Sequence, residues 1–434
     1  MTQAAPVAAP DPADARALRR RGLTLTLLTV TYFFSYMDRQ ILAILQELIK
    51  ADLRLTDTQL GLLSGLAFAI FYATLGIPVA RLADRFNRKN IVAISLALWS
   101  MMTAAGGLAA NFGQLLAARI GVGIGEAGSS PPSHSIIADL YPPNERAGAM
   151  GIFSLGVVLG AALGTTIGGL VASSYGWRNA MFVIGLPGVV LAVIVWLFVV
   201  EPRRGLSDPA RAPDAPGTPM PGLAAGFASL GRSAPAVHLV IAVTLTSMIG
   251  YGLTAWGPSY MQRTLGISVR DIALYVALPG GVFGVISAVG GGRIADRLAR
   301  GRGLYAQSLM VAVFKLVALP FMLGFYLIDQ PMLAIGSYWL SVLFANSYLG
   351  PTFALIQGLA PLRMRALWAA ITLLVINLIG LGAGPTLVGV LSDALRPQFG
   401  ADSLRWALCV FAAITPWAIF HYWRAGVLLR RAAA

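Results

Sequence analysis

Four charged residues stand inside apolar stretches, where their side chains could exchange protons or bind ions. Asp38 and Arg39 interrupt "VTYFFSYMDRQILAIL", and Arg119 and Glu126 interrupt "LLAARIGVGIGEAGSS". A charge at bilayer depth costs about 2.5–3.5 kcal/mol even on the lenient insertion scale, so such residues persist where they pair or face a cavity. A carboxylate among guanidinium groups takes up or releases a proton when its surroundings change. We therefore expect Asp38 to be the main proton-coupling residue and Glu126 the second.

The spacing of these residues predicts how they meet. Arg119 and Glu126 are seven residues apart, two helical turns or about 10 Å along one face. Asp38 and Arg39 are adjacent and diverge by about 100°, so we expect one to face the helix of Arg119 and the other a neighbouring helix. The four would line a cavity as one cluster, with Arg39 and Arg119 as counter-ions or anchors for an anionic head group. The alternative is a static link that only holds the two helices together.

The composition defines the class of protein that must position this cluster. Of the 434 residues, 57% are hydrophobic and 12% are charged, whereas soluble domains carry about 25% charged residues. The chain is therefore expected to be an all-α integral membrane protein, since long apolar runs without alternation do not form barrels. The net charge of +14 is attributed to arginines in cytoplasmic loops rather than to binding of nucleic acid.

The same composition argues against cofactor chemistry. The single cysteine, Cys409, and three scattered histidines form no metal-binding set. "GIGEAG" (123–128) fits the dinucleotide fingerprint but lacks the strand that should precede it. Neither a nucleophile with its base nor a nucleotide-binding motif is visible, so a membrane enzyme or sensor is disfavoured. We expect no metal and no cofactor, with the proton as the coupling ion.

Apolar runs of about 20 residues mark twelve candidate membrane spans. Their ranges are 23–46, 58–80, 90–110, 113–138, 147–172, 179–200, 237–262, 272–292, 304–328, 332–359, 366–391 and 405–428. With the N-terminus inside, 22 of the 32 lysines and arginines lie on the cytoplasmic side. The positive-inside rule thus predicts an inner-membrane protein with both termini cytoplasmic.

An internal repeat divides the chain into two halves. "RLADR" (81–85) returns as "RIADR" (293–297), and Gly160, Gly164 and Gly169 return as Gly380, Gly384 and Gly389. The expected parts are a tail (1–20), a six-helix half (21–200), a Pro- and Gly-rich linker (201–236) and a second six-helix half (237–434). Pseudo-two-fold symmetry between the halves predicts a substrate site at their interface, accessible alternately from each side.

These motifs resemble a known family. Twelve spans with "ARLADRFNRKN" after the second resemble the major facilitator superfamily, although Ala80 and Asn87 replace its two loop glycines. "SYMDRQILA" and "RIGVGIGEAGSS…IIADLYP" are similar to the spinster branch. The resemblance implies the same four-charge cluster and a lysophospholipid or sphingosine 1-phosphate-like cargo. A small organic anion or drug remains the alternative cargo. We expect the protein to be a monomer.

The repeated loop motif predicts a cytoplasmic latch. A carboxylate after the second span can interact with the N-terminal dipole of the eleventh and pair with a basic residue, closing that side. The two copies of the latch would pair Asp84 with Arg146 and Asp296 with Arg365. The plainer alternative is that the loop charges only set the orientation of the helices in the membrane. The complete set is Asp84, Arg85, Arg88, Lys89, Arg146, Asp296, Arg297 and Arg365.

Further residues are expected at the cavity or between the halves. Aromatic and neutral polar side chains suit a cavity that is charged on one side and apolar on the other. They are Tyr36, His134, Tyr251, Trp256, Tyr338 and Asn346. Small-residue faces on the fifth span (Gly156 to Gly168) and the eighth (Gly280 to Gly292) let helices approach closely. The resemblance implies that these two spans pack across the interface between the halves. Lys315 on the ninth span is expected to snorkel or to meet a neighbour.

Overall fold

The structure is a computed structural model that describes residues 12–207 and 222–433. Within these ranges the chain is helical and contains no strand. The helices of the first half are α1 (Pro12–Arg19), α2 (Arg21–Leu53), α3 (Asp57–Ser64), α4 (Leu66–Arg85), α5 (Arg88–Gly106), α6 (Phe112–Glu126), α7 (Ser130–Leu140) and α8 (Pro143–Phe198).

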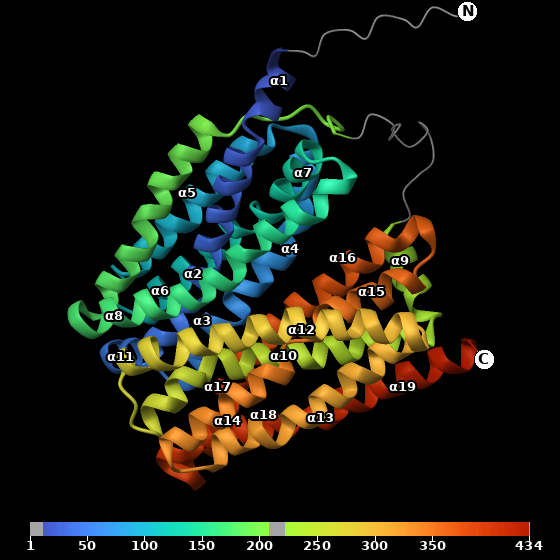
Figure 1. Ribbon diagram of the computed structural model, residues 1–434. Helices are drawn as coiled ribbons and strands as arrows, with labels where there is room; N and C mark the ends of the chain where they lie inside the picture. Colours follow the sequence, from blue (N-terminus) through green and yellow to red (C-terminus); the bar gives the residue numbers. More distant parts are fainter. Residues whose placement is uncertain (1–11, 208–221, 434) are drawn as a thin grey trace, which may run out of the picture.

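The second half is built in the same way and includes two π-helical turns. The segment before it contains α9 (Leu223–Gly231). The elements of the second half are α10 (Ala234–Arg263), α11 (Val269–Asp271), η1 (Ile272–Ala277), α12 (Leu278–Arg302), α13 (Tyr305–Leu327), α14 (Pro331–Ala345), α15 (Leu349–Leu359), η2 (Leu362–Met364), α16 (Arg365–Val375), η3 (Ile376–Ala383), α17 (Gly384–Phe399), η4 (Gly400–Asp402), α18 (Ser403–Ala412) and α19 (Thr415–Ala433). Figure 1 shows the two halves as separate bundles, coloured blue to green and yellow to red.

These helices make twelve passes, as the sequence predicts. Each half contributes six, because several passes consist of two consecutive helices and α8 makes two passes. The turn inside α8 is at Gly176, whose φ of 82° lies in the region that favours glycine. At Gly65, between α3 and α4, a Cβ atom would lie 2.3 Å from the carbonyl oxygen of Gly382 in the other half. Glycine is thus required where the halves approach most closely.

The repeated glycines confirm the internal symmetry at the level of contacts. A Cβ on Gly164 would meet Met37 of α2 at 2.7 Å, and one on Gly384 would meet Met248 of α10 at 2.4 Å. These glycines pack the fifth span on the first and the eleventh on the seventh, each within its own half.

The third glycine of each triplet lies against the other half. A Cβ on Gly169 would lie 3.2 Å from the carbonyl oxygen of Val269, and one on Gly389 would lie 2.3 Å from that of Asp57. Val269 and Asp57 are 212 residues apart, which is the offset of the repeated loop motif. The two contacts are therefore related by the pseudo-two-fold symmetry.

Spans five and eight pack across the interface, as the resemblance implies: the Thr166 hydroxyl donates to the carbonyl oxygen of Ala273 at 3.1 Å, and a Cβ on Gly169 would lie 2.8 Å from that of Ala273. Most glycines of their small-residue faces make other contacts. Gly156 and Gly160 contact residues 29–36 of α2 rather than α12. On α12, Gly280 and Gly284 lie against Tyr338 and Asn346 of the second half itself. The two spans also meet at Gly281, where a Cβ would lie 3.2 Å from the side chain of Ala162. Close packing within each half, not sliding between halves, uses most of these glycines.

The glycine contacts predict a stability difference along α8. In Gly160→Ala the new Cβ would lie 2.3 Å from the carbonyl oxygen of Phe33, so we expect a loss of about 1–3 kcal/mol of stability. The matched control is Gly148→Ala on the same helix, where nothing lies within 4 Å of the new atom. Thermal unfolding in detergent should show a lower melting temperature for the first variant only. Equal melting temperatures would contradict the close approach.

The halves join at one end of the bundle. We call it the closed end, and we call the opposite end, where the α4–α5 and α12–α13 connections lie, the basic end. Among the described residues, every hydrogen bond between the halves joins elements at the closed end. In Figure 1 the bundles meet around α3, α11 and α17 and diverge toward α7 and α16.

The segment between the halves contains a helix that was not expected. The sequence predicts a cytoplasmic linker at 201–236, unpacked over 201–222, and positions 208–221 lie outside the described residues. Within the linker, α9 packs on α16, since a Cβ on Gly226 would lie 2.6 Å from the side chain of Leu367. Its sequence, "LAAGFASLG", is apolar and small, which explains the packing.

Candidate functional site

Asp38 lies in the interior of the first half and contacts two neighbouring helices. Its carboxylate accepts a hydrogen bond from the hydroxyl of Thr103 on α5 and lies 3.3 Å from the Arg119 guanidinium on α6. Only 2% of Asp38 and 5% of Arg119 is exposed. Arg119 also donates to the carbonyl oxygen of Leu63, at 3.4 Å. A buried charge is tolerated when it is paired and hydrogen-bonded, and both conditions hold here.

Arg39 and Glu126 form a second ion pair beside the first. The Arg39 Nε and Nη2 atoms lie 2.8 and 2.7 Å from Glu126 Oε2, which also accepts from the hydroxyl of Ser35 at 2.8 Å. The guanidinium carbon lies 4.6 Å from the ring centre of Tyr72 and 4.9 Å from that of Tyr36. Aromatic faces stabilise a cation electrostatically, so Arg39 is held on several sides.

The two ion pairs correct one detail of the sequence prediction. Asp38 and Arg39 were expected to face different helices, yet each pairs with a residue of α6. Arg119 and Glu126 lie two turns apart, and the long arginine side chains span the separation. The four charges do come together, as expected, as two crossed pairs that join α2 to α6.

One oxygen of this site lacks a partner. Glu126 Oε2 has three donors, whereas Glu126 Oε1 is buried without a hydrogen bond in the described structure. A protonated carboxyl group would present its hydrogen from such an atom. The site thus contains two buried carboxylates in unequal settings.

The predicted cavity residues are distributed unevenly. Tyr36 and Tyr251 are half-buried, Tyr36 beside Arg39 and Tyr251 against the core of the first half. His134 is exposed and meets Phe153 edge to face, with ring centres 5.0 Å apart; Phe153 in turn stacks on Tyr32. Trp256 is fully buried at the closed end and donates to the carbonyl oxygen of Pro385. Trp256 therefore joins α10 to α17 within the second half.

The second-half candidates lie near a break between α14 and α15. Asn346 is exposed and Tyr338 is half-buried. Lys315 is 8% exposed and donates to the carbonyl oxygen of Ala345 at 2.7 Å, with its nitrogen 4.5 Å from the Tyr348 ring centre. Lys315 meets a neighbour, which was one of its two expected outcomes, and does not snorkel.

The closed end holds a charged cluster that the sequence did not reveal. Arg263 of α10 makes two hydrogen bonds of 2.7 Å with Asp57 of α3 and one of 2.7 Å with Glu47 of α2. Asp57 also accepts from Lys50 and from the hydroxyl of Ser392 on α17. Asp393 accepts from the backbone and hydroxyl of Thr58 at 2.7 Å. These bonds tie the halves together where the glycine contacts bring them close.

The latch expected from the loop motif is not assembled at the basic end. Asp84, Asp296 and Arg365 are exposed, and the described residues provide no ion pair for them. Arg85 and Arg297 are exposed and Lys89 is half-buried. The guanidinium of Arg146 instead donates to the carbonyl oxygens of Ala138 and Tyr141, at the end of α7. A latch that closes this end would be open in this conformation, and its role stays a prediction.

Arg88 differs from the other basic residues of the motif. Its side chain is fully buried and bonds to Glu201 at 2.6 Å, to the Pro202 carbonyl oxygen at 2.7 Å and to Asp139. Asp139 belongs to the first half, and Glu201 and Pro202 follow it directly after α8. Arg88 therefore ties α5 and α7 to the segment after α8 in this conformation, and its assignment to the latch stays a prediction.

This burial predicts a large effect on stability. In Arg88→Ala two carboxylates lose their common partner, so we expect a loss of about 3–5 kcal/mol. The exposed Arg85 supplies the control, because Arg85→Ala should stay within about 0.5 kcal/mol of the parent protein. Thermal unfolding would measure both. If Arg88→Ala and Arg85→Ala melt at the same temperature, Arg88 does not stabilise the fold in this way.

Comparison with known proteins identifies the class. The family model described as the Major Facilitator Superfamily matches residues 28–385, and the chain belongs to that family of membrane transporters. It is 36% identical to an MFS-type efflux pump of Mycolicibacterium smegmatis, over 97% of this chain and 96% of that protein. It is 28% identical to the hexuronate transporter of Bacillus subtilis, over 88% and 90% of the two chains.

The solved structures point to one branch of the family. The structure superposes with a TM-score of 0.83 on the crystal structure of a bacterial homologue of the human lysosomal transporter spinster, in an inward-facing and unoccupied conformation. The two chains are 28% identical, and the match covers 96% of this chain and 98% of the other. The predicted resemblance to spinster proteins is thereby confirmed.

Proposed function

We propose that this protein is a proton-coupled secondary transporter of an amphipathic anionic lipid, such as a lysophospholipid or a sphingosine 1-phosphate-like molecule. The observation that carries the proposal is the pair of buried ion pairs, Asp38 with Arg119 and Arg39 with Glu126. Protonation of either carboxylate would release an arginine, and a released guanidinium binds a phosphate well. Proton uptake and binding of an anionic head group would thus favour each other.

The remaining parts of the proposal concern conformation and location. We infer that the basic end faces the cytoplasm, since arginines collect there, and that both termini lie on that side of the inner membrane. The closed-end cluster would then block the outside in this conformation. In the outward-open state the latch of Asp84 with Arg146 and Asp296 with Arg365 would close the cytoplasmic side. We further propose that the protein works as a monomer, without cofactor or nucleic acid.

The names of similar proteins support a second class of cargo. Their names include an efflux pump and a hexuronate transporter, which favours a drug or a small organic anion as the alternative cargo. Both cargoes would use the same arginines and the same protons, so the mechanism does not separate them. The apolar rings around Arg39 favour the amphipathic molecule.

Flux in proteoliposomes tests the proposal. Radiolabelled lysophospholipid, a hexuronate and an anionic drug would each be offered with and without an imposed pH gradient. We expect gradient-dependent flux of the lysophospholipid and loss of the stimulation when an ionophore dissipates the gradient. If the hexuronate or the drug is transported and the lysophospholipid is not, the cargo is a small organic anion or drug instead of a lipid. Lysophospholipid flux that ignores the gradient would remove the proton coupling.

A further inference from the structure

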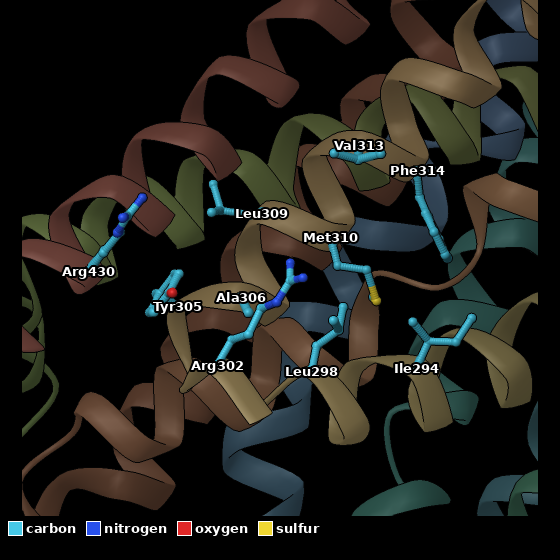
Figure 2. A pocket seen from close by; sticks show the side chains of 10 residues that line it. All are labelled: Ile294, Leu298, Arg302, Tyr305, Ala306, Leu309, Met310, Val313, Phe314 and Arg430. Atoms are coloured by element: carbon cyan, nitrogen blue, oxygen red, sulfur yellow. The ribbon is translucent and has the colours of Figure 1, made fainter. Parts of the chain in front are cut away.

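A hollow lies at the basic end of the second half, away from the two ion pairs. It has a volume of about 610 Å³ and lies between α12, α13 and α19. Figure 2 shows Arg302, Tyr305 and Arg430 toward one end of the hollow and Ile294 and Phe314 at the other. The hollow is thus basic and polar at one end and apolar at the other.

A second hollow adjoins the first and shares a wall with it. It has a volume of about 360 Å³ and is lined by Trp423 and Val427 of α19, together with Leu309, Arg430 and Arg431. Leu309 and Arg430 line both hollows. The arrangement is two mainly apolar pockets that share one guanidinium group, that of Arg430.

The arginines of this groove lack carboxylate partners. In the described part of the chain, neither Arg302 nor Arg430 forms an ion pair, and Arg430 lies only over the Tyr305 ring, at 5.9 Å. The sequence explains this, because α13 and α19 contain no Asp or Glu and α12 contains only Asp296. In the first half the basic end is neutralised differently, since Arg88 pairs with Asp139 and Glu201.

The surroundings of the groove suit the surface of a bilayer. Val313 is 54% exposed and Trp423 is 48% exposed, and both lie beside other exposed apolar groups of α13 and α19. A protein in water would rarely expose such a face, whereas tryptophan next to arginine is typical of the level of lipid head groups. Basic pockets between helix ends at this level bind anionic head groups.

We propose that this groove binds one anionic diacyl phospholipid from the leaflet at the basic end. The phosphate lies between Arg302 and Arg430, and one acyl chain occupies each hollow. Charge complementarity favours this occupant, because two unpaired guanidinium groups at an apolar groove match a phosphate that carries two chains. The site is independent of the proposed cargo, since it lies outside the ion pairs that would bind the cargo.

Native mass spectrometry of the full chain in detergent tests the site. The protein is titrated with phosphatidylglycerol, with phosphatidylcholine, and with phosphatidylglycerol in the presence of inorganic phosphate. We expect one tightly bound phosphatidylglycerol, weaker phosphatidylcholine, and about thirtyfold weaker phosphatidylglycerol in Arg302→Gln/Arg430→Gln. The matched control, Arg293→Gln/Arg297→Gln, removes two exposed arginines of α12 that do not line the groove and should bind like the parent protein.

A second variant keeps both arginines, so that weaker lipid binding can be separated from loss of folding. Val313→Trp fills the first hollow from an exposed position and should also weaken phosphatidylglycerol binding while the melting temperature is maintained. Equal binding by the arginine variant and its control would overturn the proposal. So would equal affinity for the two lipids. If millimolar phosphate displaces the lipid, the groove binds anions in general and is not a lipid site.

Discussion

Asp38→Asn should abolish the stimulation of transport by a pH gradient while exchange of cargo across the membrane continues. The amide keeps the shape of the carboxyl group but binds no proton, and it leaves Arg119 without its counter-ion. A coupling free energy of the usual size corresponds to about 5–150-fold, so we expect gradient-driven flux to fall by about tenfold. Proteoliposomes with radiolabelled cargo would measure both gradient-driven flux and counterflow.

The control for this experiment is Asp52→Asn. Asp52 forms an ion pair with Arg178 near the closed end, and its hydrogen bonds from Arg178 and Trp177 hold its pKa below the usual range. It therefore stays ionised at neutral pH and should not take part in coupling. If Asp38→Asn retained full gradient-driven flux, or if both exchange and driven flux vanished in a folded protein, the coupling role would be refuted.

Arg263→Ala should release the closed end. The guanidinium joins Asp57 and Glu47 of the first half to α10 of the second. Removal of one partner from such a buried network costs about 3–5 kcal/mol, which corresponds to a shift of about a hundredfold or more against the closed arrangement. Spin labels at Arg54→Cys and Arg396→Cys, both exposed and in opposite halves, would report the separation after Cys409→Ser.

A matched ion pair within one half separates opening from general weakening. Arg178→Ala also breaks an ion pair near the closed end, but its partner Asp52 belongs to the same half. We expect a longer label separation only in Arg263→Ala. An unchanged separation in Arg263→Ala would mean that the glycine contacts alone keep this end closed.

The parts of the fold that the sequence predicts follow from short-range rules. Apolar runs give the twelve passes, and the repeat gives the halves. The contacts of the glycines are different, because Gly160 could meet any neighbour at the same depth. The choice of α2 over α12 depends on how the helices are arranged in space, which a single sequence does not encode in its periodicity. Even so, the offset shared by Gly169 and Gly389 anticipates a pair of symmetric contacts.

The charged residues of the site also fall into those that the sequence predicts and those that it does not. Asp38, Arg39, Arg119 and Glu126 are visible in the sequence because charges in apolar runs must find partners. Asp57 and Arg263 escape notice because they stand at helix ends, where charges are ordinary, and they are 206 residues apart. Arg88 looks like its exposed neighbours Arg85 and Lys89, and only the positions of Asp139 and Glu201 in space distinguish it.

The pairing of charges in the first half has an electrical consequence. Each of the two ion pairs, Asp38 with Arg119 and Arg39 with Glu126, sums to zero. The membrane voltage acts on net charge, at about 2.3 kcal/mol per elementary charge per 100 mV, so it exerts little force on these four charges when the site is empty. One proton together with one monovalent anion preserves that balance. Transport of such a cargo should therefore produce no current, and a pH gradient alone should drive it.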